Sequence, residues 1–313
     1  MAGAKGSIVF FGTPGFAVPT LKALHESGED IGAVVTRRDA PVGRRRKMTP
    51  PPVKEFALKY GLRVLQPGRL DEAFAGELEK AVPAPDFLVV VAYGKILPRR
   101  LLSMPRLGPV NVHASLLPRW RGASPIARAI INGDRETGIT TMIMDEGMDT
   151  GRILLQEKTA IRAGDDGETL SERLAEIGAR LLLKTLAGMR QGAITPRDQE
   201  GEPSYAPPLR KEEGLVDWER PAAALADLVR GMRPWPGAYF FLRGERVGAI
   251  KARAVDGQGP PGAVVEARGA SLLIGAGKGL LSLAIVQPEG KKPMPAADFL
   301  RGRKIMKGDV LSA

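Results

Sequence analysis

Six consecutive apolar residues, Phe-Leu-Val-Val-Val-Ala at positions 87–92, restrict the folds that this chain can adopt. A strand without polar residues on either face is expected at the centre of a parallel sheet, where helices cover both faces. Shorter apolar runs at 7–11 and 31–36 predict two more strands, and helical patterns at about 53–60 and 70–81 lie between the strands. This alternation predicts right-handed crossovers and an α/β fold with a doubly wound, mostly parallel sheet.

The rest of the chain shows two kinds of pattern. The alternation of strands and helices continues after residue 109, with strands predicted at 110–113, 138–144 and 153–157 and helices at 126–132 and 169–189. A linker rich in proline and charge is predicted at 196–208. A helix at 222–231 then precedes short strands at 238–242, 246–255, 262–267, 271–275 and 280–286. Short strands between glycine and proline turns predict a small β-barrel. We therefore expect one domain at 1–195 and a second at 209–313.

The composition excludes several classes of protein. The chain has 313 residues, no cysteine and only two histidines, so disulfides, thiolate catalysis and a metal centre are not expected. No apolar run approaches the roughly 18–20 residues of a membrane span, and the first residues lack the apolar core of a signal peptide. We expect a cytoplasmic protein without metal. Because no long apolar stripe is left over for a partner, we also expect a monomer.

Positive charge is concentrated in two places. The formal net charge is +11; residues 37–47 hold six basic side chains and one acidic, and residues 207–313 hold 17 basic and 11 acidic. Such clustering predicts a polyanionic partner such as nucleic acid. The insertion at 40–52 exceeds the usual connection of about two to six residues, and its prolines and glycine predict an irregular loop.

Arginines in this insertion suit bidentate phosphate contacts, and basic residues of the predicted barrel suit a nucleic-acid backbone. The candidate residues for contacting a nucleic acid are Arg44, Arg45, Arg46 and Lys47 in the insertion and Lys251, Arg253, Arg301, Arg303 and Lys304 in the second domain. Five aromatic residues of that domain are interpreted as core and interdomain packing residues rather than base-stacking platforms; they are Trp218, Trp235, Tyr239, Phe240 and Phe241.

Three polar residues form the candidate catalytic site. Asn111 and His113 alternate along one predicted strand, so their side chains point to the same face near its C-terminal end. Asp149 lies in a glycine-flanked turn that can bring its carboxylate to the imidazole. An amide, an imidazole and a carboxylate suffice to move an acyl group without a metal or a covalent intermediate.

The turn Gly12-Thr13-Pro14-Gly15 follows the first predicted strand, where dinucleotide-binding proteins carry their glycine motif. It lacks the G-x-G-x-x-G spacing, and Thr36-Arg37-Arg38 stands where an acidic residue would end the second strand. A nicotinamide cofactor is therefore disfavoured, and the turn is interpreted as the wall of a substrate pocket.

Several motifs, in order, resemble those of the methionyl-tRNA formyltransferase family within the folate-dependent formyltransferases. They are Phe11-Gly12-Thr13-Pro14, Pro41-Val42-Gly43-Arg44, Val91-Ala92-Tyr93-Gly94, Asn111-Val112-His113, Ser115 to Ala123, Met148-Asp149-Thr150-Gly151 and Tyr205-Ala206-Pro207. The resemblance covers nearly the whole chain. The Asn-x-His and Asp triple alone would indicate only the wider folate-dependent group.

The resemblance implies a Rossmann-like catalytic domain, a C-terminal domain like an OB-fold, and a role in translation initiation. The formyl donor would be 10-formyltetrahydrofolate, and the acceptor the α-amino group of methionine on initiator tRNA. Asn111, His113 and Asp149 would be catalytic. The loop around Arg44 would engage the acceptor end of the tRNA. The folate site would be lined by Ser115, Leu116, Leu117, Pro118, Ala92, Tyr93, Gly94 and Ile96.

Three other functions stay open at this point. The first is a folate-dependent formyltransferase acting on a small amine, such as glycinamide ribonucleotide or an amino sugar, which has no use for the basic insertion. The second is a non-catalytic RNA-binding protein with a degenerate enzyme domain, against which the intact Asn111, His113 and Asp149 argue. The third is an NAD-dependent enzyme, which the glycine spacing disfavours.

Overall fold

The computed structural model describes residues 6–42 and 47–312 of the chain. They divide into two compact units, each described by itself below. The first unit comprises residues up to 125, 136–160 and 171–206, and the second comprises 126–135, 161–170 and 207 onward. In the described part of the chain, no helix combines the length and the apolar character needed to cross a bilayer.

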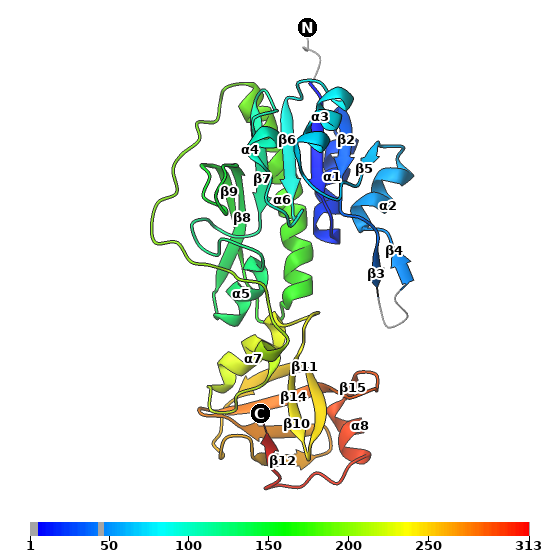
Figure 1. The fold of residues 1–313 in the computed structure, drawn as a ribbon. Coiled ribbons are helices and arrows are strands. Elements are labelled where there is room, and N and C mark those ends of the chain that lie inside the picture. Colours follow the sequence, from blue (N-terminus) through cyan, green and yellow to red (C-terminus); the bar gives the residue numbers. More distant parts are fainter. Residues whose placement is uncertain (1–5, 43–46, 313) are drawn as a thin grey trace. The chain divides into compact units, whose positions relative to one another are not determined.

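A seven-stranded sheet forms the first unit, in the order β5-β2-β1-β6-β7-β8-β9 (Figure 1). Strands β5, β2, β1, β6 and β7 pair in parallel, and β8 and β9 are antiparallel to their neighbours. The predicted mostly parallel sheet is thus confirmed, and the apolar run at 87–92 forms its central, fully buried strand β6. The strands are β1 (Ile8–Gly12), β2 (Ile31–Val35), β5 (Val64–Leu65), β6 (Phe87–Val91), β7 (Gly108–His113), β8 (Glu136–Ile143) and β9 (Ile153–Ala160).

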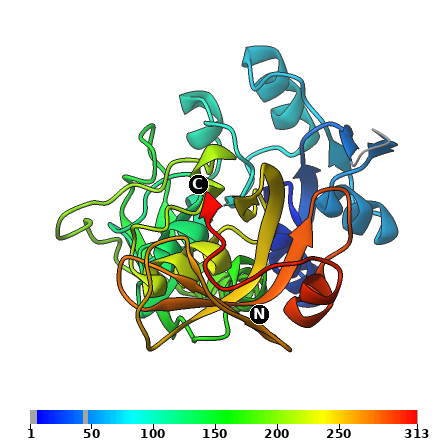
Figure 2. The ribbon, with the colours of Figure 1, turned by 90° about the horizontal axis from the view of Figure 1, so that it is seen from below.

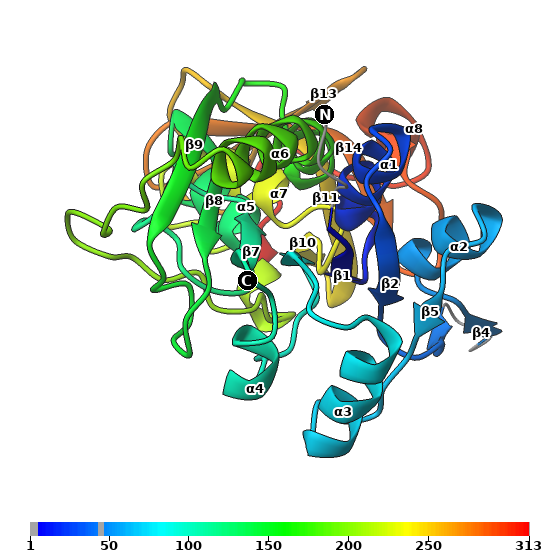
Figure 3. The same ribbon diagram turned by 90° about the horizontal axis from the view of Figure 1, so that it is seen from above.

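Helices cover both faces of this sheet: α1 and α6 lie on one face, and α3 and α4 on the other (Figure 3). Two contacts show how the sequence fixes this packing. A Cβ atom on Gly178 of α6 would lie 2.9 Å from Val112 Cγ1 of β7, so glycine permits close approach there. Asp71 begins α3 by accepting a hydrogen bond from the Phe74 amide. The helices are α1 (Val18–Glu26), α2 (Pro52–Lys59), α3 (Glu72–Ala81), α4 (Arg99–Leu102) and α6 (Gly167–Arg190), with a 3-10 turn η1 (Gly15–Ala17).

The strand order of the sheet reverses beside β1. The chain passes from β1 to β2 on one side and returns to β6 on the other. In open α/β sheets, ligands bind outside the carboxyl ends of the strands at such a reversal. The ends of β1, β6 and β7 are therefore the expected place for a site, and β7 ends at His113.

One sequence prediction in this unit is wrong. The insertion at 40–52 was expected to lack regular structure, but β3 (Ala40–Val42) and β4 (Lys47–Thr49) pair as an antiparallel hairpin. A two-stranded ribbon has no central strand, so Pro41 can occupy an edge, where its missing N–H breaks no ladder. The predicted contact residues Arg44, Arg45 and Arg46 lie outside the described residues.

The second unit contains a strongly curled antiparallel sheet in the order β12-β13-β14-β11-β10-β16, with β15 paired to β14 (Figure 2). Its C-terminal segment links both ends: Leu311 pairs with Leu242 of β10, and the Leu311 amide donates to Gly262 O just before β12. The sheet is thus curled toward a barrel, as predicted. Its strands are β10 (Ala238–Leu242), β11 (Glu245–Val255), β12 (Val264–Arg268), β13 (Ser271–Gly275), β14 (Leu280–Pro288), β15 (Met294–Pro295) and β16 (Leu311–Ser312).

Three helices and a 3-10 turn complete the second unit: α5 (Pro125–Ile131), η2 (Glu212–Gly214), α7 (Ala222–Gly231) and α8 (Ala296–Arg301). Its core joins α7 and α8 to the inner face of the sheet and includes Trp218 and Phe240, whose interpretation as packing residues is confirmed. For Trp235 that interpretation is wrong, because its side chain is 56% exposed.

Candidate active site

Strand β7 supplies the first two residues of the site. Asn111 and His113 are buried side chains on the face opposite Val112, which packs toward α6. Polar side chains as buried as these are normally hydrogen-bonded. Asn111 is 8% exposed and is not among the described side chains whose buried polar atoms lack a partner, so its carboxamide reaches the surface of the site.

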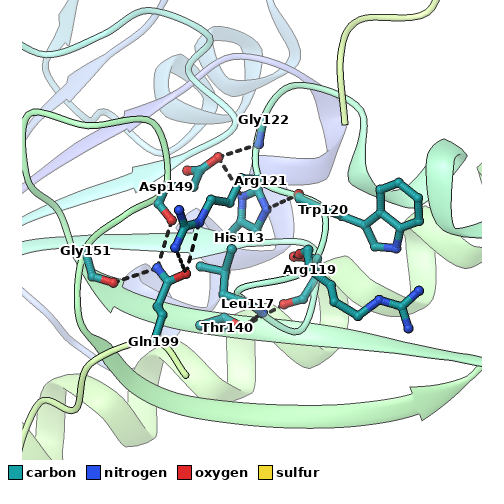
Figure 4. A network of polar contacts seen from close by, with 11 residues as sticks. His113, Leu117, Arg119, Trp120, Arg121, Gly122, Thr140, Asp149, Gly151 and Gln199 are labelled. Carbon is teal, nitrogen blue, oxygen red and sulfur yellow. Dashed lines mark hydrogen bonds and ion pairs between the residues drawn. The ribbon is translucent and has the colours of Figure 1, made fainter. Parts of the chain in front are cut away.

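Two acceptors hold the ring of His113 (Figure 4). Its Nε2 lies 2.9 Å from the backbone oxygen of Trp120, and its Nδ1 lies 3.6 Å from Oδ2 of Asp149. A carbonyl oxygen only accepts, so Nε2 carries a proton. Nδ1 faces the carboxylate of Asp149. The sequence prediction that Asp149 meets the imidazole agrees with this geometry.

Asp149 lies in the loop between β8 and β9, where its backbone has the left-handed φ of 55° that aspartate adopts more readily than most residues. Its Oδ2 accepts a 2.7 Å hydrogen bond from the Gly122 amide. Asp145 caps the start of the same loop by accepting from the Gly147 amide and the Thr150 hydroxyl. The carboxylate of Asp149 therefore contacts the site from a constrained turn.

The predicted folate loop, residues 115–118 after β7, is hydrogen-bonded to Thr140 of the neighbouring strand β8. The Thr140 hydroxyl donates to Ser115 O at 2.6 Å and accepts from the Leu117 amide at 3.1 Å. The side chains of Ser115 and Leu117 are buried, and the Ser115 hydroxyl donates to Arg119 O. Leu116 and Pro118 are partly exposed. Any ligand at this loop would thus meet its backbone and these two side chains rather than Ser115 or Leu117.

The other predicted folate segment follows β6 at the strand reversal. Ala92 and Gly94 adopt left-handed backbone conformations, with φ of 47° and 74°, and Ile96 is 80% exposed. Tyr93 points inward against Phe11, and burial raises the pKa of its phenol. The segment therefore presents backbone, the apolar side chains of Ala92 and Ile96, and the charged Lys95 at the surface.

A cleft of about 710 Å³ opens elsewhere in the first unit, near the end of β2 and the start of α3. None of the predicted catalytic or folate residues lines it. Its lining includes Arg38 and Arg69 but also Asp71 and Glu77, so the cleft is not cationic overall. Arg37, which follows β2 next to Arg38, donates to Gly94 O and so links this sheet edge to the segment after β6.

The predicted tRNA-contacting residues of the second unit are of two kinds. Lys251 and Arg253 are exposed at alternate positions of β11, as predicted, and Lys304 is exposed near the C-terminus; Lys47 of β4 is exposed in the first unit. Arg303 instead forms a bidentate pair with Glu245, which lowers the pKa of that carboxyl, and Arg301 pairs with Asp298.

Sequence reasoning missed the residues that surround the three predicted catalytic residues. Gln199 hydrogen-bonds the Asp149 loop and Arg121, and Ser204 accepts from the Trp120 amide at 2.9 Å. All of them fall in the Trp120–Gly122 loop or in the segment predicted as a linker. Their sequence signals were the motif from Ser115 to Ala123, which includes Arg121, and the motif Tyr205-Ala206-Pro207, which follows Ser204; Gln199 had none. Among the described residues, no group of three or more His, Asp or Glu side chains could hold a metal ion.

Two family models match this chain and identify the family to which it belongs. The model described as formyl transferase matches residues 6–186, and the formyl transferase C-terminal domain matches residues 208–304. The chain belongs to the formyl transferase family.

Close relatives of this formyl transferase match it along nearly its full length. A protein of Thermodesulfovibrio yellowstonii named methionyl-tRNA formyltransferase is 49% identical over 97% of this chain and 98% of its own. One of Pelobacter propionicus with the same name is 49% identical over 97% of this chain and 96% of its own.

Solved structures share the fold at lower identity. HypX from Aquifex aeolicus in complex with tetrahydrofolic acid has a TM-score of 0.64 and 18% identity over 94% of this chain and 46% of its own. An N-formyltransferase from Helicobacter canadensis has a TM-score of 0.67 and 16% identity over 91% of this chain and 99% of its own. For a methionyl-tRNA formyltransferase from Clostridium thermocellum the TM-score is 0.56, at 16% identity over 81% and 95%.

Proposed function

We propose that this formyl transferase moves the formyl group of 10-formyltetrahydrofolate onto the α-amino group of methionine carried by initiator tRNA. One observation supports the proposal: Asp149 faces the His113 ring at the carboxyl end of β7, the strand that also carries Asn111, in a chain whose full-length relatives bear that activity in their names. The product would serve translation initiation, which we infer to take place in the cytoplasm with the enzyme acting as a monomer.

The three side chains have distinct tasks in this reaction. When the amine adds to the formyl carbon, negative charge develops on the formyl oxygen, and the amide of Asn111 can donate to it. The oxyanion then collapses, the bond from the formyl carbon to N10 of the folate breaks, and the proton that the amine gives up passes through Asp149 and water to that leaving nitrogen. Loss of one such donor costs about 2.7–4 kcal/mol of barrier, or roughly 10²–10³ in rate. For His113 to donate as well, the formyl oxygen has to replace the Trp120 carbonyl, which now accepts from Nε2. Asp149 orients the ring and stabilises its charged form.

The residues present fit a folate. The exposed Ile96 and the backbone of Ala92 and Gly94 lie at the strand reversal, beside the strand that carries Asn111. An apolar contact and backbone groups that meet the polar edge of a flat heterocycle are what a pterin needs. We propose that this segment and the backbone of 115–118 bind the folate, which supplies an activated formyl group.

The proposed tRNA surface has two parts. On the first unit, Lys47 continues the Arg44, Arg45 and Arg46 run, which lies outside the described residues. On the second unit, Lys251, Arg253 and Lys304 are exposed and suit backbone phosphates. Arg301 and Arg303 already have carboxylate partners, so we assign them a smaller share of tRNA binding.

Incubation of the protein with labelled 10-formyltetrahydrofolate and methionyl-tRNA tests the proposal. Formylmethionyl-tRNA is the expected product, with elongator methionyl-tRNA, glycinamide ribonucleotide and an amino-sugar nucleotide as competing acceptors. If a small amine were formylated and methionyl-tRNA were not, the small amine rather than the tRNA would be the acceptor. Folate and tRNA binding without any transfer would support the non-catalytic alternative.

A further inference from the structure

The side chain of Gln199 uses its full hydrogen-bonding capacity at the edge of the candidate site. Its Nε2 donates to the backbone oxygens of Asp149 and Gly151, each at 2.8 Å (Figure 4). Its Oε1 accepts from Nε and Nη2 of Arg121, at 3.1 and 2.7 Å. Two donated and two accepted bonds leave this carboxamide one orientation. Gln199 thereby links two loops that are distant in sequence.

Both linked loops have backbone conformations that need support. Asp149 has φ of 55°, and on the other loop Trp120 and Gly122 have φ of 62° and 115°. Non-glycine residues persist in the left-handed region when surrounding contacts hold them there. The two loops meet where the Gly122 amide donates to Oδ2 of Asp149, which is the oxygen that faces His113.

The residues after Gln199 bind the second of these loops by its backbone. Arg121 N donates to Ser204 O at 2.8 Å, and Ala206 N donates to Arg121 O at 2.7 Å. The Ser204 hydroxyl accepts from the Trp120 amide. The Trp120 carbonyl accepts from His113 Nε2, and these hydrogen bonds from residues 199–206 fix its position.

We propose that Gln199 is a positioning residue for catalysis: it holds the Asp149 turn against the Gly122 amide and the His113 ring. This inference rests on the proposed function for its kinetic consequences. Gln199 touches no reacting atom, so it acts through Asp149. Its removal should lower turnover and leave the affinity for both substrates nearly unchanged, because neither proposed binding surface includes it.

Gln199→Glu is the informative substitution. Glutamate keeps the shape and the pairing with Arg121 but cannot donate to the oxygens of Asp149 and Gly151. We expect kcat to fall by at least about tenfold while both KM values change by less than about threefold. Gln191→Glu, the same change at an exposed glutamine after α6, is the control and should match wild type. Wild-type kcat in Gln199→Glu would overturn the proposal.

A double-mutant cycle separates positioning from a general structural role. If Gln199 acts through Asp149, adding Gln199→Glu to Asp149→Ala should change kcat by less than about twofold. The same loss in both backgrounds would overturn the proposal. Gln199→Met, which keeps length and bulk, repeats the cycle if the glutamate variant folds poorly by circular dichroism.

A readout without activity keeps this test distinct from that of the proposed function. The chain has two histidines, His25 and His113, so imidazole ¹⁵N resonances can be assigned by substitution. Gln199→Glu should shift the two ¹⁵N resonances of His113 and leave those of His25 in place. Unchanged His113 resonances would overturn the role of Gln199, whereas a wild-type protein unable to formylate methionyl-tRNA would overturn only the proposed function.

Discussion

Asp149→Asn isolates the negative charge beside His113, because asparagine also tolerates the left-handed backbone and its oxygen can still accept from the Gly122 amide. Oδ2 of Asp149 lies 3.6 Å from Nδ1 of His113. At an effective dielectric constant of about 20, opposite unit charges at that separation attract by about 4–5 kcal/mol. At that dielectric constant, this attraction is the upper limit of the effect that the charge has on a protonated imidazole.

The expected loss is smaller than this limit, because the asparagine dipole and nearby water replace part of the interaction. We expect kcat to fall by about 10²–10³, which corresponds to about 2.7–4 kcal/mol. Single-turnover formylation at saturating substrates measures it, and thermal melts check folding. The kcat values of His113→Ala and Asp149→Ala should likewise each fall by at least about 10².

Asp145→Asn is the matched control, since it makes the same change in the same loop at an exposed residue that caps the turn. Its kcat should stay within about twofold of wild type. If Asp149→Asn retained more than about a tenth of wild-type turnover, the carboxylate would not stabilise the charged ring, and the reasoning from the 3.6 Å contact would be refuted.

Three further predictions concern binding and stability. Arg44→Ala should weaken methionyl-tRNA binding far more than folate binding, as filter binding and fluorescence titration can show; equal tRNA affinity would make the basic insertion mere solvated surface. The hydrogen bond from Arg128 lowers the pKa of Glu213, so this pair stabilises the second unit above about pH 4.5 and the contribution is lost as pH falls through the lowered pKa. The difference in melting temperature between wild type and Glu213→Gln should therefore be largest at pH 7 and become smaller in acid. A difference that does not change with pH would contradict this prediction. Arg190→Met removes the bidentate partner of Glu29, a carboxylate 6% exposed, and should lower the free energy of unfolding by about 3 kcal/mol in urea titrations; a change under about 1 kcal/mol would count against it.

Long patterned segments could be predicted from the sequence alone. The run at 87–92 had no polar residue and formed β6, and the 3.6-residue period of α6 extends over 24 residues. Short elements could not be predicted, because six residues in α8 or two in β16 are too few to establish a period. The β3–β4 hairpin was missed because Pro41 argues against a strand unless that strand lies at an edge.

The candidate site divides in the same way. Asn111 and His113 could be paired from sequence because a strand puts alternate residues on one face, and Asp149 because glycines mark its turn. Gln199 had no local signal: it contacts Asp149 across 50 positions and Arg121 across 78. Only tertiary structure brings such residues together, so a segment rich in proline and charge was interpreted as a linker.

The hydrogen bonds of residues 199–206 explain how the site keeps an unfavourable backbone. Left-handed conformations at residues such as Trp120 and Asp149 cost about 1–3 kcal/mol each and persist only if other contacts over-determine them. A buried hydrogen bond contributes about 0.5–1.5 kcal/mol. No single bond can therefore hold both loops, but the combined bonds of Gln199, Ser204 and Ala206 can. The segment between the two family domains is therefore more than a connection, since its hydrogen bonds hold the loops that place the Asp149 carboxylate and the Trp120 carbonyl on either side of one imidazole.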